Sequence, residues 1–193
     1  MCASAHERIV ISCIEMVNVN PRHWPLPFAL WAMLLQVCNS GLVRVIMGEG
    51  MTELTLKAAQ TIVDTAHKHA RQNNFNPLAI IVLDNRGALR TGLSEDGTSL
   101  MRWKVAFAKA WGAVAWGAGS KRLEKIAEER PAFMGAAAHI ADGGILPVGG
   151  GVLIRDAENR IIGSVGVSGD TSDNDEAAAT AGIIAAGFTA DGG

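Results

Sequence analysis

The stretch from Leu146 to Glu176 constrains the fold of this chain more than any other segment. It opens with a triple glycine, continues with two apolar runs separated by a polar turn, and ends with a second glycine-rich loop before an acidic helix start. Only a β-hairpin that leads into a helix explains this order well. Because glycine lets the backbone approach other atoms closely, the two loops predict a small-molecule pocket or a tight subunit contact.

The sequence between residue 52 and this stretch predicts several helices, with apolar residues three, four and seven positions apart. The first is expected to run to about Asn74, and either Thr52 or Thr55 can cap its start. Further helices are expected over about 99–116, 120–129 and 131–141. Ser120 is the expected N-cap of the 120–129 helix.

Hairpins and a final helix complete the pattern. Short β-rich runs around polar turns predict hairpins over 78–93 and 151–168. The last helix is expected from about Asp173 to Phe188, with Asp173 and Glu176 spaced as a capping box. Antiparallel hairpins alternating with helices predict an α+β fold, an α/β/α sandwich unlike the βαβ sheets that bind nucleotides.

Composition excludes several classes of protein. A length of 193 residues is enough for one domain with a hydrophobic core. The composition, 49% hydrophobic and 19% charged, is typical of a globular protein. A net charge of -2 without a long basic run argues against a nucleic-acid partner. No apolar run reaches the roughly 20 residues of a membrane-spanning helix, so we expect no membrane partner. The three cysteines precede residue 39, and their spacing fits neither a zinc site nor a disulfide framework.

Residues 1–50 differ from the rest of the chain. They lack a regular apolar period and contain three prolines between positions 21 and 27. We expect 1–50 to be a poorly structured N-terminal extension and 51–193 to be the folded domain. The apolar run over 26–37 fits a secretory signal poorly, since acidic residues precede it and no small-residue cleavage site follows it.

The start of translation and the location of the protein depend on this extension. Codons for Gly48, Glu49 and Gly50 are purine-rich and can resemble a ribosome-binding site. Our hypothesis is that translation starts at Met51 or Met47 and that the protein is cytoplasmic. The alternative is export, if the apolar segment is a real signal.

Several segments, taken in order, carry a family resemblance. They are residues 54–59, 81–87, 108–111, 146–151, 163–169 and 175–176. Over about 52–188 the chain resembles the bacterial GlcG/HbpS family of haem-degrading and haem-binding proteins, which also includes the C-terminal domain of PduO-type cobalamin adenosyltransferases. The resemblance implies a profilin-like three-layer α/β/α sandwich with a five-stranded antiparallel sheet, usually assembled into homo-oligomers. Membership implies fold more strongly than activity.

Two histidines in the first helix are the leading candidates for a haem ligand. His67 and His69 lie about 160° apart around the helix, so they cannot bind one metal together. Either could be an axial ligand of haem iron, and the plainer interpretation is a solvent-exposed histidine. The resemblance favours His67, because some family members use a histidine in this helix.

Other candidate ligands have plain structural explanations. His139 and Asp142 are three residues apart and could form a metal pair, although such pairs are common by chance. Met101 and Met134 could be soft iron ligands, but packing is the favoured role. The aromatic residues at helical spacing predict a core stripe, or a surface on which a flat ring stacks; they are Trp103, Phe107 and Trp111.

A pair of cations and the glycine loops make a second candidate site. Lys109 matches a lysine of the family and, with Arg102, could pair with a haem propionate or another carboxylate. An ion pair at a subunit contact explains them equally well. The glycines whose backbone could approach a ligand are Gly149, Gly150, Gly151 and Gly169. Acidic residues at the start of the last helix disfavour phosphate there.

Three functions remain open. The first is a haem- or tetrapyrrole-binding oligomeric domain of the GlcG/HbpS type, for binding, sensing or sequestration. The second is an enzyme or accessory protein that binds a small carboxylic acid in glycolate or diol catabolism, and the third is a structural assembly domain. A conventional hydrolase is disfavoured, because after residue 50 the chain has no cysteine nucleophile, no P-loop and no G-x-S-x-G motif.

Overall fold

The computed structural model describes residues 53–141 and 144–193. The expectations for residues 1–50, and for Asp142 as a metal ligand, lie outside these residues. The helices are α4 (Leu56–Gln72), α5 (Arg102–Trp116), α6 (Ser120–Glu129), α7 (Pro131–Ile140) and α8 (Ser172–Ala185). The strands are β1 (Ala79–Asp84), β2 (Leu89–Ser94), β3 (Gly151–Arg155), β4 (Ile161–Ser168) and β5 (Thr189–Asp191).

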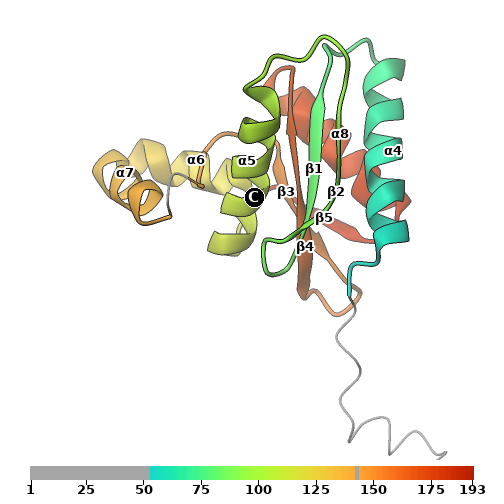
Figure 1. Cartoon of the computed structure of the whole chain (residues 1–193). Helices are drawn as coiled ribbons and strands as arrows, with labels where there is room; N and C mark the ends of the chain where they lie inside the picture. The colour runs from blue at the N-terminus through green and yellow to red at the C-terminus, as the bar shows by residue number, and fades with distance from the viewer. Residues whose placement is uncertain (1–52, 142–143) are drawn as a thin grey trace, which may run out of the picture. The chain divides into compact units, whose positions relative to one another are not determined.

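The strands form one antiparallel sheet in the order β2-β1-β4-β3-β5. β1 with β2 and β3 with β4 are the two predicted hairpins, and Val82 of β1 lies opposite Val165 of β4 where the hairpins join. Helices α4 and α8 cover one face of the sheet, and α5 covers the other (Figure 1). This arrangement confirms the predicted α+β fold, with five antiparallel strands between helical layers.

Alternating side chains of the strands supply a separate core to each face. On the α4–α8 side, residues such as Ile80, Val82 and Val167 pack against Ile62 and Ile183 in the larger core. The intervening β1 residues point toward α5, where Ala79, Ile81 and Leu83 pack against Ala106 and Ala110. Both faces of β1 are therefore buried, each by every second side chain. This explains why the whole strand is apolar apart from Asp84.

Helix α5 lies unusually close to strand β4. A Cβ atom on Gly166 would meet the backbone carbonyl of Ala106 and lie 2.8 Å from the backbone nitrogen of Ala110. Beside this contact, the hydroxyl of Ser164 donates a hydrogen bond of 2.8 Å to the carbonyl oxygen of Ala110. Glycine and serine on β4 thus let the helix backbone touch the sheet, which places the inner face of α5 within reach of α8.

The predicted N-cap of the first helix is confirmed, and that of α6 is wrong. Thr55 caps α4 through its hydroxyl, which accepts a hydrogen bond of 3.2 Å from the Ala58 N–H. Gly119 is the N-cap and Ser120 is the first residue of α6, and the Ser120 hydroxyl instead accepts a 2.7 Å hydrogen bond from the N–H of Gly151. The Ser120 hydroxyl does not cap its own helix because it is buried in a tertiary contact that joins α6 to the start of β3.

The predicted capping box of the last helix is also wrong. Thr171 is the N-cap of α8, and its hydroxyl accepts a 3.3 Å hydrogen bond from the Asn174 N–H. Asp173 is therefore in the first turn, and both Asp173 and Glu176 contact the ammonium of Lys121 at 3.2 Å. The observed cap, Thr171, lies two residues before the predicted cap, Asp173. The predicted capping box is therefore out of register with the helix.

Helices α6 and α7 extend away from the sheet on the α5 side (Figure 1). They rest on a small core of Leu123, Met134 and Ile145. α7 has no acidic or basic side chain except His139, yet Phe133 and Ile140 are exposed to 41% and 83%. None of the helices in the described part of the chain combines the length and apolar character needed to cross a membrane.

Candidate functional site

The two histidines of α4 have different neighbours. The Nε2 atom of His67 lies 2.8 Å from Oε1 of Glu95, and the His67 side chain is 40% exposed. His69 meets the ring of Phe75 edge-on, with 5.8 Å between the ring centroids. His67 therefore faces the segment that follows β2, whereas His69 faces the loop that follows α4.

The carboxylate of Glu95 is also in contact with Arg71. Arg71 Nε lies 3.2 Å from the same Oε1 atom that contacts His67. The other oxygen of Glu95 accepts a 3.2 Å hydrogen bond from the N–H of Leu78. This carboxylate is 10% exposed, so a polar group that the sequence analysis did not single out is buried beside the leading candidate ligand.

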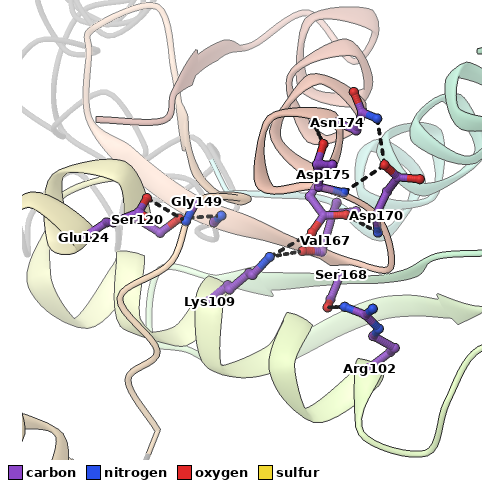
Figure 2. A network of polar contacts seen from close by, with 12 residues as sticks. Arg102, Lys109, Ser120, Glu124, Gly149, Val167, Ser168, Asp170, Asn174 and Asp175 are labelled. Atoms are coloured by element: carbon purple, nitrogen blue, oxygen red, sulfur yellow. Dashed lines mark hydrogen bonds and ion pairs between the residues drawn. The ribbon is translucent and has the colours of Figure 1, made fainter. Parts of the chain in front are cut away.

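Lys109 and Asp175 form a buried ion pair between α5 and α8 (Figure 2). Their side chains are 4% and 1% exposed, and 2.8 Å separates Nζ from Oδ2. The ammonium also donates a 3.0 Å hydrogen bond to the carbonyl oxygen of Val167. Burial raises the pKa of Asp175, and the hydrogen bond and positive charge of Lys109 act in the opposite direction.

The predicted cation pair does converge, but on the protein's own groups. The guanidinium of Arg102 donates a 3.4 Å hydrogen bond to the Ser168 hydroxyl, and its charge acts to lower the pKa of Asp175 (Figure 2). Lys109 is buried with its ammonium engaged by Asp175 and Val167, so it presents no charge to a ligand. The sequence analysis paired these two cations but did not identify Asp175 as the partner of Lys109.

The glycine loops also face the interior of the protein. Gly149 and Gly151 donate their N–H groups to Glu124 Oε2 and Ser120 Oγ, at 3.3 and 2.7 Å. Gly150 has a φ of +107°, and a Cβ there would lie 3.0 Å from the Lys109 ammonium. The four predicted glycines are all buried, and Gly169 lies against the carbonyl of Pro77. Helices and a neighbouring loop of the same domain therefore approach the backbone of these glycines closely.

The remaining candidates lie apart from one another. Met134 is buried in the small core under α7, as the packing interpretation predicted, whereas Met101 is 60% exposed. His139 is exposed on α7. Of the aromatic stripe, Phe107 and Trp111 border the core and Trp103 is 45% exposed. Within the described residues, no three side chains among His, Cys, Asp and Glu come together as a metal site.

A family model decides which proteins this domain is related to. The model described as haem degrading protein HbpS-like matches residues 54–184. The chain belongs to this family. The match includes both histidines of α4, the buried ion pair and both glycine loops of the HbpS-like domain. Curated protein sequences contain no significant match to the chain.

Solved structures support the same assignment. A crystal structure of Streptomyces reticuli HbpS, a double mutant, is 28% identical and has a TM-score of 0.59, over 69% of this chain and 86% of that chain. A PduOC–haem complex is 22% identical with a TM-score of 0.64, covering 71% and 97% of the two chains. The Klebsiella pneumoniae protein ORFY is 24% identical with a TM-score of 0.64, over 71% and 93%. The two structures below 25% identity support the fold alone.

Two open hollows in the HbpS-like domain lie away from the α4 histidines. One, of about 420 Å³, runs between α5 and α7 and is lined by apolar side chains, among them Trp111, Trp116 and Phe133. The other, of about 570 Å³, lies along α6 beside Lys121, Arg122 and Lys125. Neither of these two hollows is lined by His67, whose side chain is 40% exposed.

Proposed function

We propose that this HbpS-like domain binds haem or a related tetrapyrrole, with His67 as an axial ligand of the iron. The observation that supports this proposal most is the contact of 2.8 Å between one nitrogen of His67 and a buried carboxylate. A histidine held in this way offers its other nitrogen to a metal. A relative of the same fold is named as a haem complex, PduOC, which makes haem the first ligand to test.

The other candidate ligands are weaker for structural reasons. Met134 is buried at 3% exposure beneath α7, out of reach of a large planar ligand. The ring of His69 meets Phe75 edge-on, and no carboxylate contacts His69 within the described residues. The proposal therefore concentrates on His67, at the exposed edge of the sheet where β2 has no further strand beside it.

The donor chemistry around His67 fits a haem iron. Neutral imidazole is a common axial ligand, and the 40% exposure of the His67 side chain leaves room for a ligand to approach. Within residues 53–141 and 144–193, no hydrogen bond engages Nδ1 of this ring. Haem, when bound, supplies an iron that changes oxidation state and binds small molecules. The chain itself places the ring 2.8 Å from Glu95 and keeps that carboxylate largely out of solvent.

Replacing His67 is expected to weaken haem binding strongly. In a haem titration of the full chain followed by absorbance, His67→Ala should weaken binding by more than about 100-fold, the upper end of the effect of losing an outer-shell partner. His69→Ala is the matched control, on the same helix two residues away, and should bind like the wild type. Circular dichroism would check that both variants remain folded.

Each other outcome of the titration has a distinct meaning. Binding that survives in both variants would move the ligand to Met101 or His139, the two other exposed candidates. The absence of a saturable absorbance change in the wild type would contradict haem binding by this family member. The carboxylic-acid alternative gains no support from Lys109, whose ammonium is engaged by Asp175.

We also propose that the domain forms a homo-oligomer through α7. This helix carries two exposed apolar side chains, lies beside an apolar hollow and, by its composition, resembles a helix that is buried on all sides. Ile140→Asp should therefore lower the molar mass measured by light scattering. Ile184→Asp on α8, at 62% exposure, is the matched control and should leave the mass unchanged. The reverse result would place the contact on α8.

A further inference from the structure

Glu95 is held in one position by contacts on every side. Its backbone N–H donates a 3.0 Å hydrogen bond to the Leu78 carbonyl, and the Leu78 N–H donates in return to Oε2 at 3.2 Å. The carbonyl of Glu95 accepts a 2.8 Å hydrogen bond from the hydroxyl of Thr98. Because backbone and side chain are both bonded to Leu78, the residue before β1, the second carboxylate oxygen has a defined direction, toward α4.

That second oxygen meets two side chains from the last turns of α4. His67 Nε2 lies 2.8 Å from Oε1, and Arg71 Nε lies 3.2 Å from it. Neither contact is an aligned hydrogen bond, and Oε1 is buried without one among the described residues. A buried carboxylate oxygen is stabilised by a well-aligned donor, so a small rotation of the His67 ring toward Oε1 would be favourable.

Arg71 supplies the positive charge that the buried carboxylate needs. It is fixed as well, since Nη2 donates hydrogen bonds to the carbonyls of Phe75 and Asn76 at 2.8 and 3.0 Å. With this charge in place, the imidazole of His67 needs to contribute only an N–H. An Nε2–H tautomer has its lone pair on Nδ1, the atom that can then bind a metal.

We infer that Glu95 is a positioning residue for the haem site, which selects the Nε2–H tautomer of His67 and increases the donor strength of its other nitrogen. This inference rests on the function proposed above. A carboxylate behind a ligating histidine fixes the ring and raises its basicity, and loss of such a partner costs metal sites about 10- to 100-fold in affinity. A more basic axial ligand favours the ferric over the ferrous state of the iron.

The first experiment needs no haem. Nitrogen-15 NMR of the apo full chain reads the tautomer of the His67 ring from the shifts of its two nitrogens. The wild type should show the Nε2–H form, and Glu95→Gln should show a mixture, since the amide keeps the Leu78 contact but lacks the charge. Asp96→Asn changes the exposed neighbouring carboxylate and is the matched control, expected to match the wild type. A mixture in the wild type would overturn the inference even if Glu95→Gln failed to fold.

The second experiment uses the haem-loaded protein. Glu95→Gln should weaken ferric haem binding by about 10- to 100-fold and move the reduction potential to a more positive value, whereas Asp96→Asn should change neither. If the wild type binds haem through His67 and Glu95→Gln alters neither affinity nor potential, the inference is wrong and the proposed function stands. If the wild type binds no haem, the proposed function is wrong, and Glu95 is then not a haem-site residue. The NMR result would still decide whether Glu95 orients His67.

Discussion

Replacing Lys109 with methionine is expected to destabilise the domain by about 3–5 kcal/mol, the usual cost of breaking a buried ion pair from one side. The substitution would leave the carboxylate of Asp175, 1% exposed, with one hydrogen bond of 3.1 Å from the Asp170 N–H. Methionine keeps most of the volume of the lysine stem, so the loss would report the missing charge. The measurement is the free energy of unfolding in urea.

Two further variants separate the charge from the packing. Lys121→Met removes a lysine that is 42% exposed and paired with Asp173 and Glu176, and should cost less than about 1 kcal/mol. The double variant Lys109→Met with Asp175→Leu should recover most of the loss, because an apolar pair can replace a buried ion pair. A double variant as unstable as the single one would contradict this account.

The pH dependence of the Lys109→Met variant should have a definite sign. Burial already raises the pKa of Asp175, and removing the ammonium takes away the largest opposing effect. A folded-state pKa above the unfolded one means that the folded state binds the proton more strongly. The stability deficit of the variant should therefore shrink as the pH falls and Asp175 becomes protonated, and grow again as the pH rises through that pKa.

The helices and strands could be predicted because they depend on local sequence patterns. What the sequence analysis missed were contacts between residues far apart in the chain. The spacing of apolar residues in β1 and α4 is a property of each segment, and it predicted both correctly. Asp175 does lie in the first turn of the last helix, but its pairing with Lys109, 66 positions earlier in the chain, leaves no local pattern. Ser120 looked like a cap for the same reason, since Gly151 is 31 positions away.

The candidate site was predicted only in part. His67 could be singled out because histidine is a metal ligand and because the family resemblance favoured its helix. Glu95 could not, because a lone glutamate after a strand is usually exposed, and only the packing of α4 beside β2 buries this one. The polar clusters around Lys109 and His67 differ in exposure. The cluster of Lys109 is closed to ligands, and that of His67 has one side open to solvent.

Adding a single methyl group at Gly166 is expected to destabilise the domain by about 3 kcal/mol or more, at the upper end of overpacking effects. The new Cβ would collide with backbone atoms of α5, namely the carbonyl of Ala106 and the nitrogen of Ala110. Backbone atoms of a helix cannot rotate away as a side chain can, so α5 as a whole would have to move from the sheet. Gly135→Ala on α7 is the control, since no atom lies within 4 Å of its Cβ position and alanine favours a helix by about 1 kcal/mol.

The same displacement should couple Gly166 to the buried ion pair. Moving α5 away from β4 would draw Lys109 from Asp175 and from the Val167 carbonyl, both of which now lie within 3.0 Å of its ammonium. Gly166→Ala and Lys109→Met should therefore be less than additive when combined, because the first already weakens what the second removes. Full additivity in urea unfolding, or a wild-type stability of Gly166→Ala, would mean that the close contact of α5 with β4 does not hold the ion pair in place.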